Sequence, residues 1–233
     1  MRSIRRFARV LPLALLCAVL ALVIPAQETK TPAPAAASQS AAPAERLSLA
    51  GIHNAARVDT ALFRGGQPDT KGYEELRGLG ISYVVDLRNR GRDADRERHE
   101  VESRGMHYVG IPSSGTRGPT LEQIAGFLLL VRGHPGQKVF VHCHRGADRT
   151  GVMVAAYRIS AQHWTAEQAR AEMLDFHAYR FLSAMGHTVR DFPGNYETNP
   201  AFASLRLPLP PAIANPAPSA APALVLEPAP VKP

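Results

Sequence analysis

The chain has 233 residues, a formal net charge of +7 and 45% apolar residues, which fits one globular domain with additional segments. Removing the four arginines of residues 1–26 from this charge leaves +3, so the rest of the chain is only mildly basic. A charge of that size argues against nucleic acid as the partner.

Residues 1–26 have the pattern of a secretory signal peptide. Four arginines precede an apolar run, Val10–Ile24, and Ala26 offers a small residue for cleavage. The run is shorter than the roughly 18–20 residues of a spanning helix, so we expect cleavage and no stable membrane insertion. The sequence therefore predicts export, to the periplasm or the medium. Cys17 would be lost with the signal, leaving Cys143 without a disulfide partner in its own chain.

The composition divides the rest of the chain into three parts. Residues 27–45 are rich in alanine, proline and serine, which is typical of a linker. Residues 201–233 are rich in proline and alanine, and we expect a disordered tail there. The folded domain is then expected over residues 46–200, a common domain size.

The first half of this domain alternates short strands and helices. Residues 57–66 contain strand-like pieces that end at a "GGQP" turn signal, and a helix is expected to follow Asp69. Residues 81–87 read as a buried strand and residues 106–111 as another. Between them, residues 92–105 predict a charged helix, which we interpret as a solvated face rather than a site.

The second half continues the alternation. Thr120, with Gln123 three residues later, forms a capping box that starts a helix to residue 132, and Thr165 starts another in the same way. Residues 138–143 predict a strand and 150–159 a buried helix. This order predicts an α/β fold: a central, mostly parallel sheet flanked by helices. Ligands bind at the carboxyl ends of such strands, where Cys143 lies.

The loop between this strand and helix has the residues of a phosphate site. Backbone N–H groups at a helix N-terminus attract an anion, and Arg149 adds a planar fork suited to two phosphate oxygens. The same positive field favours the thiolate of Cys143, which can attack phosphorus. Gly146 permits a tight turn and Gly151 a close approach of the helix. The hydroxyl of Thr150 is placed to hydrogen-bond the sulfur and help it leave.

The segment "HCHRGADRTG" resembles the signature loop of the cysteine-dependent protein tyrosine and dual-specificity phosphatases. The upstream "LFRGGQPDTKGYEELRGLGISYVVDLRNR" resembles the start of compact bacterial and fungal dual-specificity-like phosphatases, and the resemblance covers most of residues 54–175. It implies Cys143 as the nucleophile, Arg149 as the phosphate clamp and no metal or other cofactor. The alternative is a small buried apolar cysteine. The resemblance also implies a phosphate cradle formed by the backbone amides of His144, Arg145, Gly146, Ala147, Asp148 and Arg149.

One departure from this family concerns the general acid. The family usually takes an aspartate from a separate upstream loop, but residues 112–119 contain no carboxylate. Glu122 follows in the first turn of a helix, where an acidic side chain serves the helix dipole. Asp148 lies inside the loop itself, as in relatives with "KDRTG" loops that resemble this arrangement. It is either the acid or a brace for the loop backbone.

Other polar residues receive more modest interpretations. His142 is expected to order the loop by hydrogen bonding rather than to act as a base. Arg145 is either a surface arginine or a contact for a second phosphate. Asp86 and Arg88 are expected to form a structural pair, and Arg64 to fix a turn. The remaining histidines show no metal-ligand spacing.

Together these features predict an exported phosphatase that acts on phosphotyrosine or a broader set of phosphomonoesters, with a phosphorylated protein or a small phosphomonoester as its partner. An inositol phosphate or phosphoinositide phosphatase is an alternative, which Arg145 and Asp148 would suit. A phosphate-ester binding module without turnover is another, because the usual acid is missing.

Overall fold

The computed structural model describes residues 41–179, 181 and 183–208. The expected signal at residues 1–26, most of the expected linker and residues 209–233 of the expected tail lie outside the described residues. All described residues belong to one compact unit.

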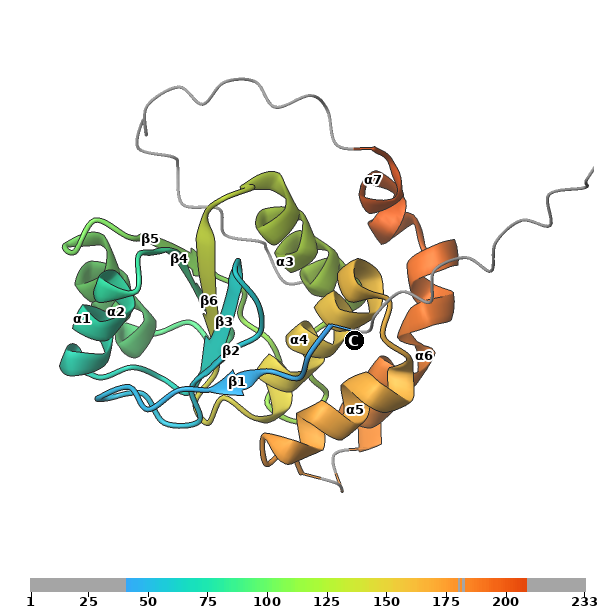
Figure 1. The fold of residues 1–233 in the computed structure, drawn as a ribbon, viewed down its shortest axis with the longest axis horizontal. Coiled ribbons are helices and arrows are strands. Elements are labelled where there is room, and N and C mark those ends of the chain that lie inside the picture. The colour runs from blue at the N-terminus through green and yellow to red at the C-terminus, as the bar shows by residue number, and fades with distance from the viewer. Residues whose placement is uncertain (1–40, 180, 182, 209–233) are drawn as a thin grey trace, which may run out of the picture. The chain divides into compact units, whose positions relative to one another are not determined.

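The sheet has six strands in the order β1-β2-β3-β6-β4-β5 (Figure 1). They are β1 Glu45–Arg46, β2 Ala56–Arg57, β3 Leu62–Gly65, β4 Ile81–Asp86, β5 His107–Gly110 and β6 Lys138–His142. β3, β6, β4 and β5 run parallel, which confirms the predicted sheet. β1 and β2 add an antiparallel edge that the sequence did not predict.

Helices lie on both sides of this sheet. They are α1 Thr70–Gly78, α2 Arg92–Glu102, α3 Leu121–Gly133, α4 Asp148–Gln162, α5 Ala166–Asp175, α6 Ser183–Thr198, the 3-10 helix η1 Pro200–Phe202 and α7 Ala203–Arg206. Figure 1 shows α1 and α2 on one side and α3 to α7 on the other. Both predicted capping boxes are present, at Thr120 and at Thr165.

The central strand β6 separates two apolar clusters. Its Phe140 belongs to the cluster beneath α1 and α2, whereas Val139 and Val141 point into the larger cluster beneath α3 to α6. This alternation is the period of two expected of a strand. Neighbouring strands bury β6 on both edges, and the pairing places Gly65 of β3 and Asp86 of β4 beside His142. The carboxyl end of β6 therefore emerges at the middle of the sheet.

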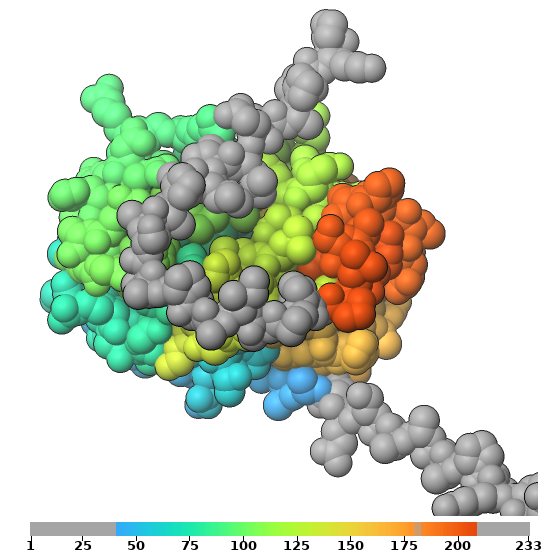
Figure 2. Space-filling model, turned by 90° about the horizontal axis from the view of Figure 1, so that it is seen from above, coloured from blue at the N-terminus to red at the C-terminus, as the bar shows by residue number. Residues whose placement is uncertain are grey.

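The folded domain extends beyond the predicted limit at residue 200. Phe202 and Leu205 are buried in the larger apolar cluster, and the side chain of Arg132 on α3 donates to the carbonyl of Leu205. Figure 2 shows α7 beside α3 on the surface. Residues 201–208 therefore belong to the domain rather than to a tail, because Phe202 and Leu205 complete its core.

Helix α6 had no counterpart among the predicted elements. It buries Met185, Val189 and Phe192 and contains Pro193.

None of the helices in the described part of the chain is both long and apolar enough to span a membrane.

Candidate active site

Cys143 lies directly between β6 and α4, where the sequence analysis placed it. It is 3% exposed and opens onto a pocket of about 270 Å³. The pocket is lined by Gly115, Cys143, His144, Arg145, Asp148, Arg149, Tyr179 and Phe181. The fold thus gathers most of the expected cradle side chains around the thiol, and adds two aromatic residues that the sequence analysis did not single out.

The loop after Cys143 is held from its outer side. The backbone N–H of Gln67 and the side chains of Asn54 and Arg64 donate to the carbonyls of residues 144–146 at 2.9–3.3 Å. In a trans peptide the N–H points opposite to the carbonyl. Because these carbonyls face outward, the amides that follow them face inward, as a phosphate cradle requires.

Two glycines make this geometry possible. Gly146 has a φ of +67°, and a side chain there would overlap the backbone of Gly65 and Gly66. Gly151 lies so close to Met173 of α5 that a Cβ would clash with that side chain. Glycine is therefore required at residue 146 by the left-handed backbone and at residue 151 by the close packing against α5.

The environment of Cys143 favours its thiolate. Burial alone would raise the pKa of the thiol, but hydrogen bonds from the side chain and backbone of Thr150, the charge of Arg149 and the backbone of Ala147 outweigh it. The pKa of Cys143 is therefore below its usual value. The Thr150 hydroxyl is buried and meets hydrogen-bond geometry with none of the described residues, but it lies close enough to the sulfur to lower the pKa of the thiol.

Arg149 reaches across the pocket from the first turn of α4. Its Nη1 donates to the carbonyl of Leu87 after β4 at 3.0 Å and to that of Ser113 at 3.3 Å. Anchored through this nitrogen, the guanidinium lines the pocket with Cys143. The N–H groups of a planar guanidinium are suited to bind two oxygens of one phosphate.

A buried charge network lies behind the loop. The Arg88 guanidinium binds both Asp86 oxygens at 2.8–2.9 Å and also contacts Glu97. His142 has Nδ1 3.2 Å from the Cys143 carbonyl and Nε2 2.9 Å from Glu97, an ion-pair distance without the alignment of a hydrogen bond. Burial lowers the pKa of His142, but Glu97 and Asp86 raise it above its usual value, which favours a proton on the ring. A protonated ring is a donor rather than a base, as predicted.

The position of Glu97 corrects the interpretation of α2 as a solvated face. Glu97 is 2% exposed, whereas most polar residues of the helix face solvent. The signal that could have found it is Val101, the large apolar residue one turn later, because residues four apart share a helix face. The predicted pair of Asp86 and Arg88 is confirmed.

The same carboxylates bear on the question of a metal. One ligand atom each from Asp86, Glu97 and His142 lies within 4.8 Å of the others. The Arg88 guanidinium already contacts both carboxylates, and the His142 ring, which favours its proton, faces them as well, so this group fits an added cation poorly.

Arg64 also differs from its predicted role. It is 1% exposed, its guanidinium stacks 3.8 Å from the ring centroid of Phe176, and its Nη2 donates to the Gly146 carbonyl. Burial lowers the pKa of Arg64 to about 10, while Glu172 and Cys143 act in the opposite direction. Arg64 thus supports the phosphate loop rather than a local turn.

Asp148 faces the pocket and is also tied to its rim. Its Oδ1 accepts the backbone N–H of Tyr179 at 2.7 Å, and its Oδ2 lies 3.4 Å from Arg145. Arg145 also donates to the carbonyl of His177 and lies over the Tyr179 ring at 4.0 Å. Glu122, in contrast, is exposed on α3 and is not among the described residues that line this pocket.

Comparison with known proteins agrees with this geometry. Residues 43–185 match the family model described as "DSP-PTPase phosphatase fused to NAD+ Kinase". The chain belongs to this phosphatase family. Its relatives among dual-specificity phosphatases include dual specificity protein phosphatase 26 of Mus musculus, 29% identical over 56% of this chain and 64% of the relative. Dual specificity protein phosphatase TpbA of Pseudomonas aeruginosa is 28% identical over 52% of this chain and 53% of its own.

The chain spans less than two thirds of the length of these two phosphatases.

Solved structures of phosphatases share the fold. The crystal structure of P. aeruginosa TpbA has a TM-score of 0.57 at 24% identity, covering 66% of this chain and 94% of that one. A PTPMT1 structure has a TM-score of 0.53 at 21% identity, covering 63% of this chain and 97% of that one. The predicted fold class is thereby confirmed.

Arg149 leads to a first prediction for this phosphatase domain. We expect Arg149→Lys to lower kcat/KM for phosphate esters about 100- to 1,000-fold, the cost of losing a preorganised donor to the transition state. An ammonium group keeps the charge but lacks the planar fork. Steady-state kinetics measures the loss, with Arg132→Lys on the far part of α3 as the control. Unchanged kcat/KM in Arg149→Lys would remove this residue from the site.

Proposed function

We propose that this protein is a cysteine-dependent phosphatase that hydrolyses phosphomonoesters, phosphotyrosine among them, through a phosphocysteine intermediate. The observation that carries the proposal is the position of Cys143, with its lowered pKa, in one pocket with Arg149 at the N-terminus of α4. The matched family and the dual-specificity relatives support the same chemistry.

The reaction has two steps. The Cys143 thiolate attacks phosphorus, a sulfur–phosphorus bond forms, and the bond from phosphorus to the ester oxygen breaks. The alcohol or phenol leaves with a proton supplied by a general acid. Water then attacks the phosphocysteine and gives a proton back to the group that acted as the acid. The sulfur–phosphorus bond breaks, inorganic phosphate is released, and the sulfur leaves as a thiolate stabilised by the Thr150 hydroxyl. Arg149 and the loop amides balance the charge on the phosphoryl oxygens in both steps.

Phosphotyrosine is the substrate we favour. TpbA has been crystallised in complex with pTyr, and PTPMT1 in complex with PI(5)P. The alternative of an inositol phosphate or phosphoinositide substrate rested on Arg145, as the contact for a second phosphate, together with Asp148. Here that guanidinium already contacts a backbone carbonyl, Asp148 and the face of Tyr179. Its contacts favour a structural role at the rim over a second phosphate site.

A binding module without turnover is the other alternative. Against it stand a thiol whose pKa is lowered and the Thr150 hydroxyl that contributes to lowering it, since neither is needed merely to hold phosphate. The decisive experiment is phosphate release from p-nitrophenyl phosphate, followed by a screen of phosphopeptides, inositol phosphates and phosphoinositides. Absence of turnover on every ester, together with tight phosphate binding, would favour the binding module.

We also propose that the protein is exported. The support is the sequence of residues 1–26, with its basic start, apolar run and small residue at the expected cleavage position. We expect fractionation of a bacterial host, with mass spectrometry of the N-terminus, to find a shortened protein outside the cytoplasm. Replacing Leu15 and Leu16 by arginine should retain the full-length chain in the cytoplasm. Full-length protein confined to the cytoplasm without these changes would contradict export.

A further inference from the structure

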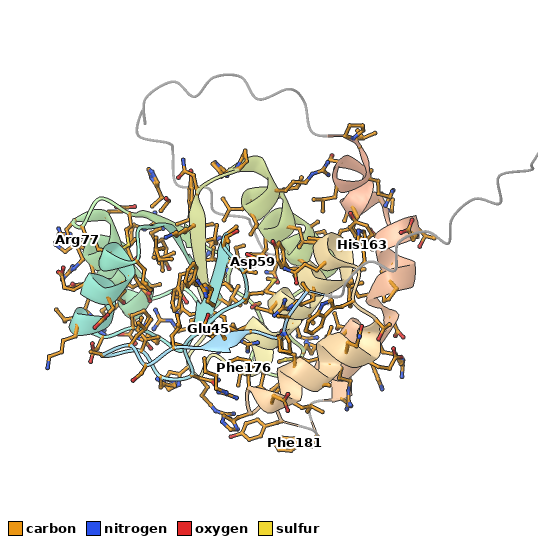
Figure 3. All side chains as sticks on the ribbon, in the orientation of Figure 1. Glu45, Asp59, Arg77, His163, Phe176 and Phe181 are labelled. Carbon is orange, nitrogen blue, oxygen red and sulfur yellow. The ribbon has the colours of Figure 1, made fainter. Side chains whose placement is uncertain are left out.

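Two exposed aromatic side chains stand at the mouth of the active-site pocket. Tyr179 is 46% exposed and Phe181 is 75% exposed, and both line the pocket that contains Cys143. Figure 3 shows Phe181 projecting from the segment between α5 and α6. Large apolar side chains exposed beside a site commonly mark a surface that binds a ligand. Neither residue has a role in the proposed mechanism.

The pair is held in a defined orientation. The two rings stack with centroids 4.8 Å apart and planes 24° from parallel. The Arg145 guanidinium covers Tyr179 at 4.0 Å from the ring centroid, and the Tyr179 backbone N–H binds Asp148 of the phosphate loop. The aromatic surface is therefore attached to the loop that would hold the phosphate.

Another part of the same pocket has no side chain to fill it. Gly115 lines the pocket, and a Cβ built on it would have no neighbour within 4 Å. The rim thus combines an aromatic surface with open space. Such a space admits a flat ring attached to a phosphate, since aromatic rings gain most when they meet another ring offset-stacked or edge-on.

We propose that Tyr179 and Phe181 form an aromatic wall that receives the ring of an aryl phosphate and makes this site select phosphotyrosine over alkyl phosphomonoesters. This inference rests on the proposed phosphatase function and adds the residues that set substrate class. A phosphoserine presents only a methylene group and the peptide backbone at the same depth, and these make no stacking contact. The wall therefore raises affinity for the aryl ester alone.

The test compares two peptides of one sequence, carrying either phosphotyrosine or phosphoserine. Phe181→Ala should lower kcat/KM for the phosphotyrosine peptide about two- to tenfold, the range for loss of one aromatic pair, and leave the phosphoserine peptide unchanged. Tyr179→Leu should act in the same direction, and its backbone N–H is retained for Asp148. Leu129→Ala, which removes an exposed apolar side chain on α3, is the matched control. An equal loss on both peptides, or no loss on either, would overturn the aromatic wall.

Calorimetry separates this inference from the proposed turnover. In the Cys143→Ser background, Phe181→Ala should weaken phosphotyrosine binding about two- to tenfold and leave inorganic phosphate binding unchanged. If the wild type hydrolyses no ester but this difference appears, the proposed turnover fails and the aromatic wall stands. If the wild type hydrolyses both peptides and the difference is absent, the wall fails and the function stands. Absence of phosphate and phosphotyrosine binding would overturn both.

Discussion

Replacement of Cys143 by serine is expected to abolish turnover and leave the fold and phosphate binding intact. Serine is nearly isosteric with cysteine, and the site is buried at the centre of the sheet, so the core should close around it. A serine hydroxyl remains protonated at neutral pH, and the neighbouring His142 is committed to Glu97 and to the Cys143 carbonyl rather than free to activate it. We expect kcat to fall roughly a thousandfold or more, as when other enzymes lose their nucleophile.

The measurement has three parts. Phosphate release from p-nitrophenyl phosphate gives kcat, thermal unfolding reports the fold, and calorimetry with inorganic phosphate reports the cradle. Ser113→Ala, beside the site but without a role at the sulfur, is a suitable control for general disturbance. A serine variant with near wild-type kcat would place the nucleophile elsewhere and refute the mechanism.

The lowered pKa of Cys143 adds a pH dependence to the same experiment. The thiolate is the reactive form, so alkylation by iodoacetamide is fast above the pKa of the thiol and slows as the pH falls through it. Because the pKa lies below its usual value, we expect this slowing at a lower pH than for a free cysteine, whose pKa is about 8.5. Thr150→Val removes the hydroxyl that donates to the sulfur and should shift the midpoint upward. Unchanged midpoints in the variant would exclude that hydrogen bond.

The parts of the site that are local in sequence could be predicted. The order of strand, Cys143, Gly146, Arg149 and helix fits within about 20 residues, and each step has its own signal. The capping boxes that begin α3 and α5 are equally local. For the same reason the parallel sheet followed from the alternation of strands and helices.

The supports of the loop could not be predicted in this way. Asn54 and Arg64 bind loop carbonyls that are 82 to 92 residues away in sequence, and neither residue belongs to a periodic pattern. Glu97 lies on a helix whose composition is that of a surface; Val101 marks the buried face, but the contact of Glu97 with His142 is known only from the tertiary structure. Polar residues that act over long sequence distances need the tertiary structure, since propensity describes only neighbours in the chain.

Helix α6 could not be predicted because a local signal in its sequence opposes a helix. Met185, Val189 and Phe192 have the spacing of a buried helix face, yet Pro193 argues locally against a helix. The packing of this face on the core outweighs that preference. Helix α6 also bears on the active site, because the segment between α5 and α6 carries Tyr179.

The loop that follows Cys143 is held in place by residues of several other elements. Its carbonyls are held on one side by Asn54 and Arg64, and its first residue is held through His142 by a buried pair of carboxylates. Fixing the donors before substrate arrives avoids reorganisation during the reaction. The cost of burying these charges is offset by Arg88, which contacts both Asp86 and Glu97.

Asp148→Asn is expected to slow hydrolysis of phosphotyrosine strongly and to spare an ester whose leaving group is very acidic. Asp148 is the only carboxylate among the described residues that line the pocket with Cys143. A tyrosyl oxygen leaves poorly unless it is protonated, and a general acid contributes roughly 100- to 10,000-fold. Asparagine keeps an oxygen for the Tyr179 N–H, so the loop remains braced while the proton is lost. The contact of Oδ2 with Arg145, at 3.4 Å, is longer than a strong charge-assisted bond and leaves that oxygen free to turn toward a substrate.

The experiment measures kcat/KM for a phosphotyrosine peptide and for 2,4-dinitrophenyl phosphate, whose phenolate leaves without help. The ratio of the two losses isolates proton donation, because an altered cradle would slow both esters alike. Glu122→Gln is the matched control: it removes a carboxyl group from the nearest upstream helix, at an exposed position outside the pocket. A selective loss in Glu122→Gln would move the acid to the start of α3. Equal losses on both esters in Asp148→Asn would show that Asp148 shapes the loop through Tyr179 and Arg145 and donates no proton.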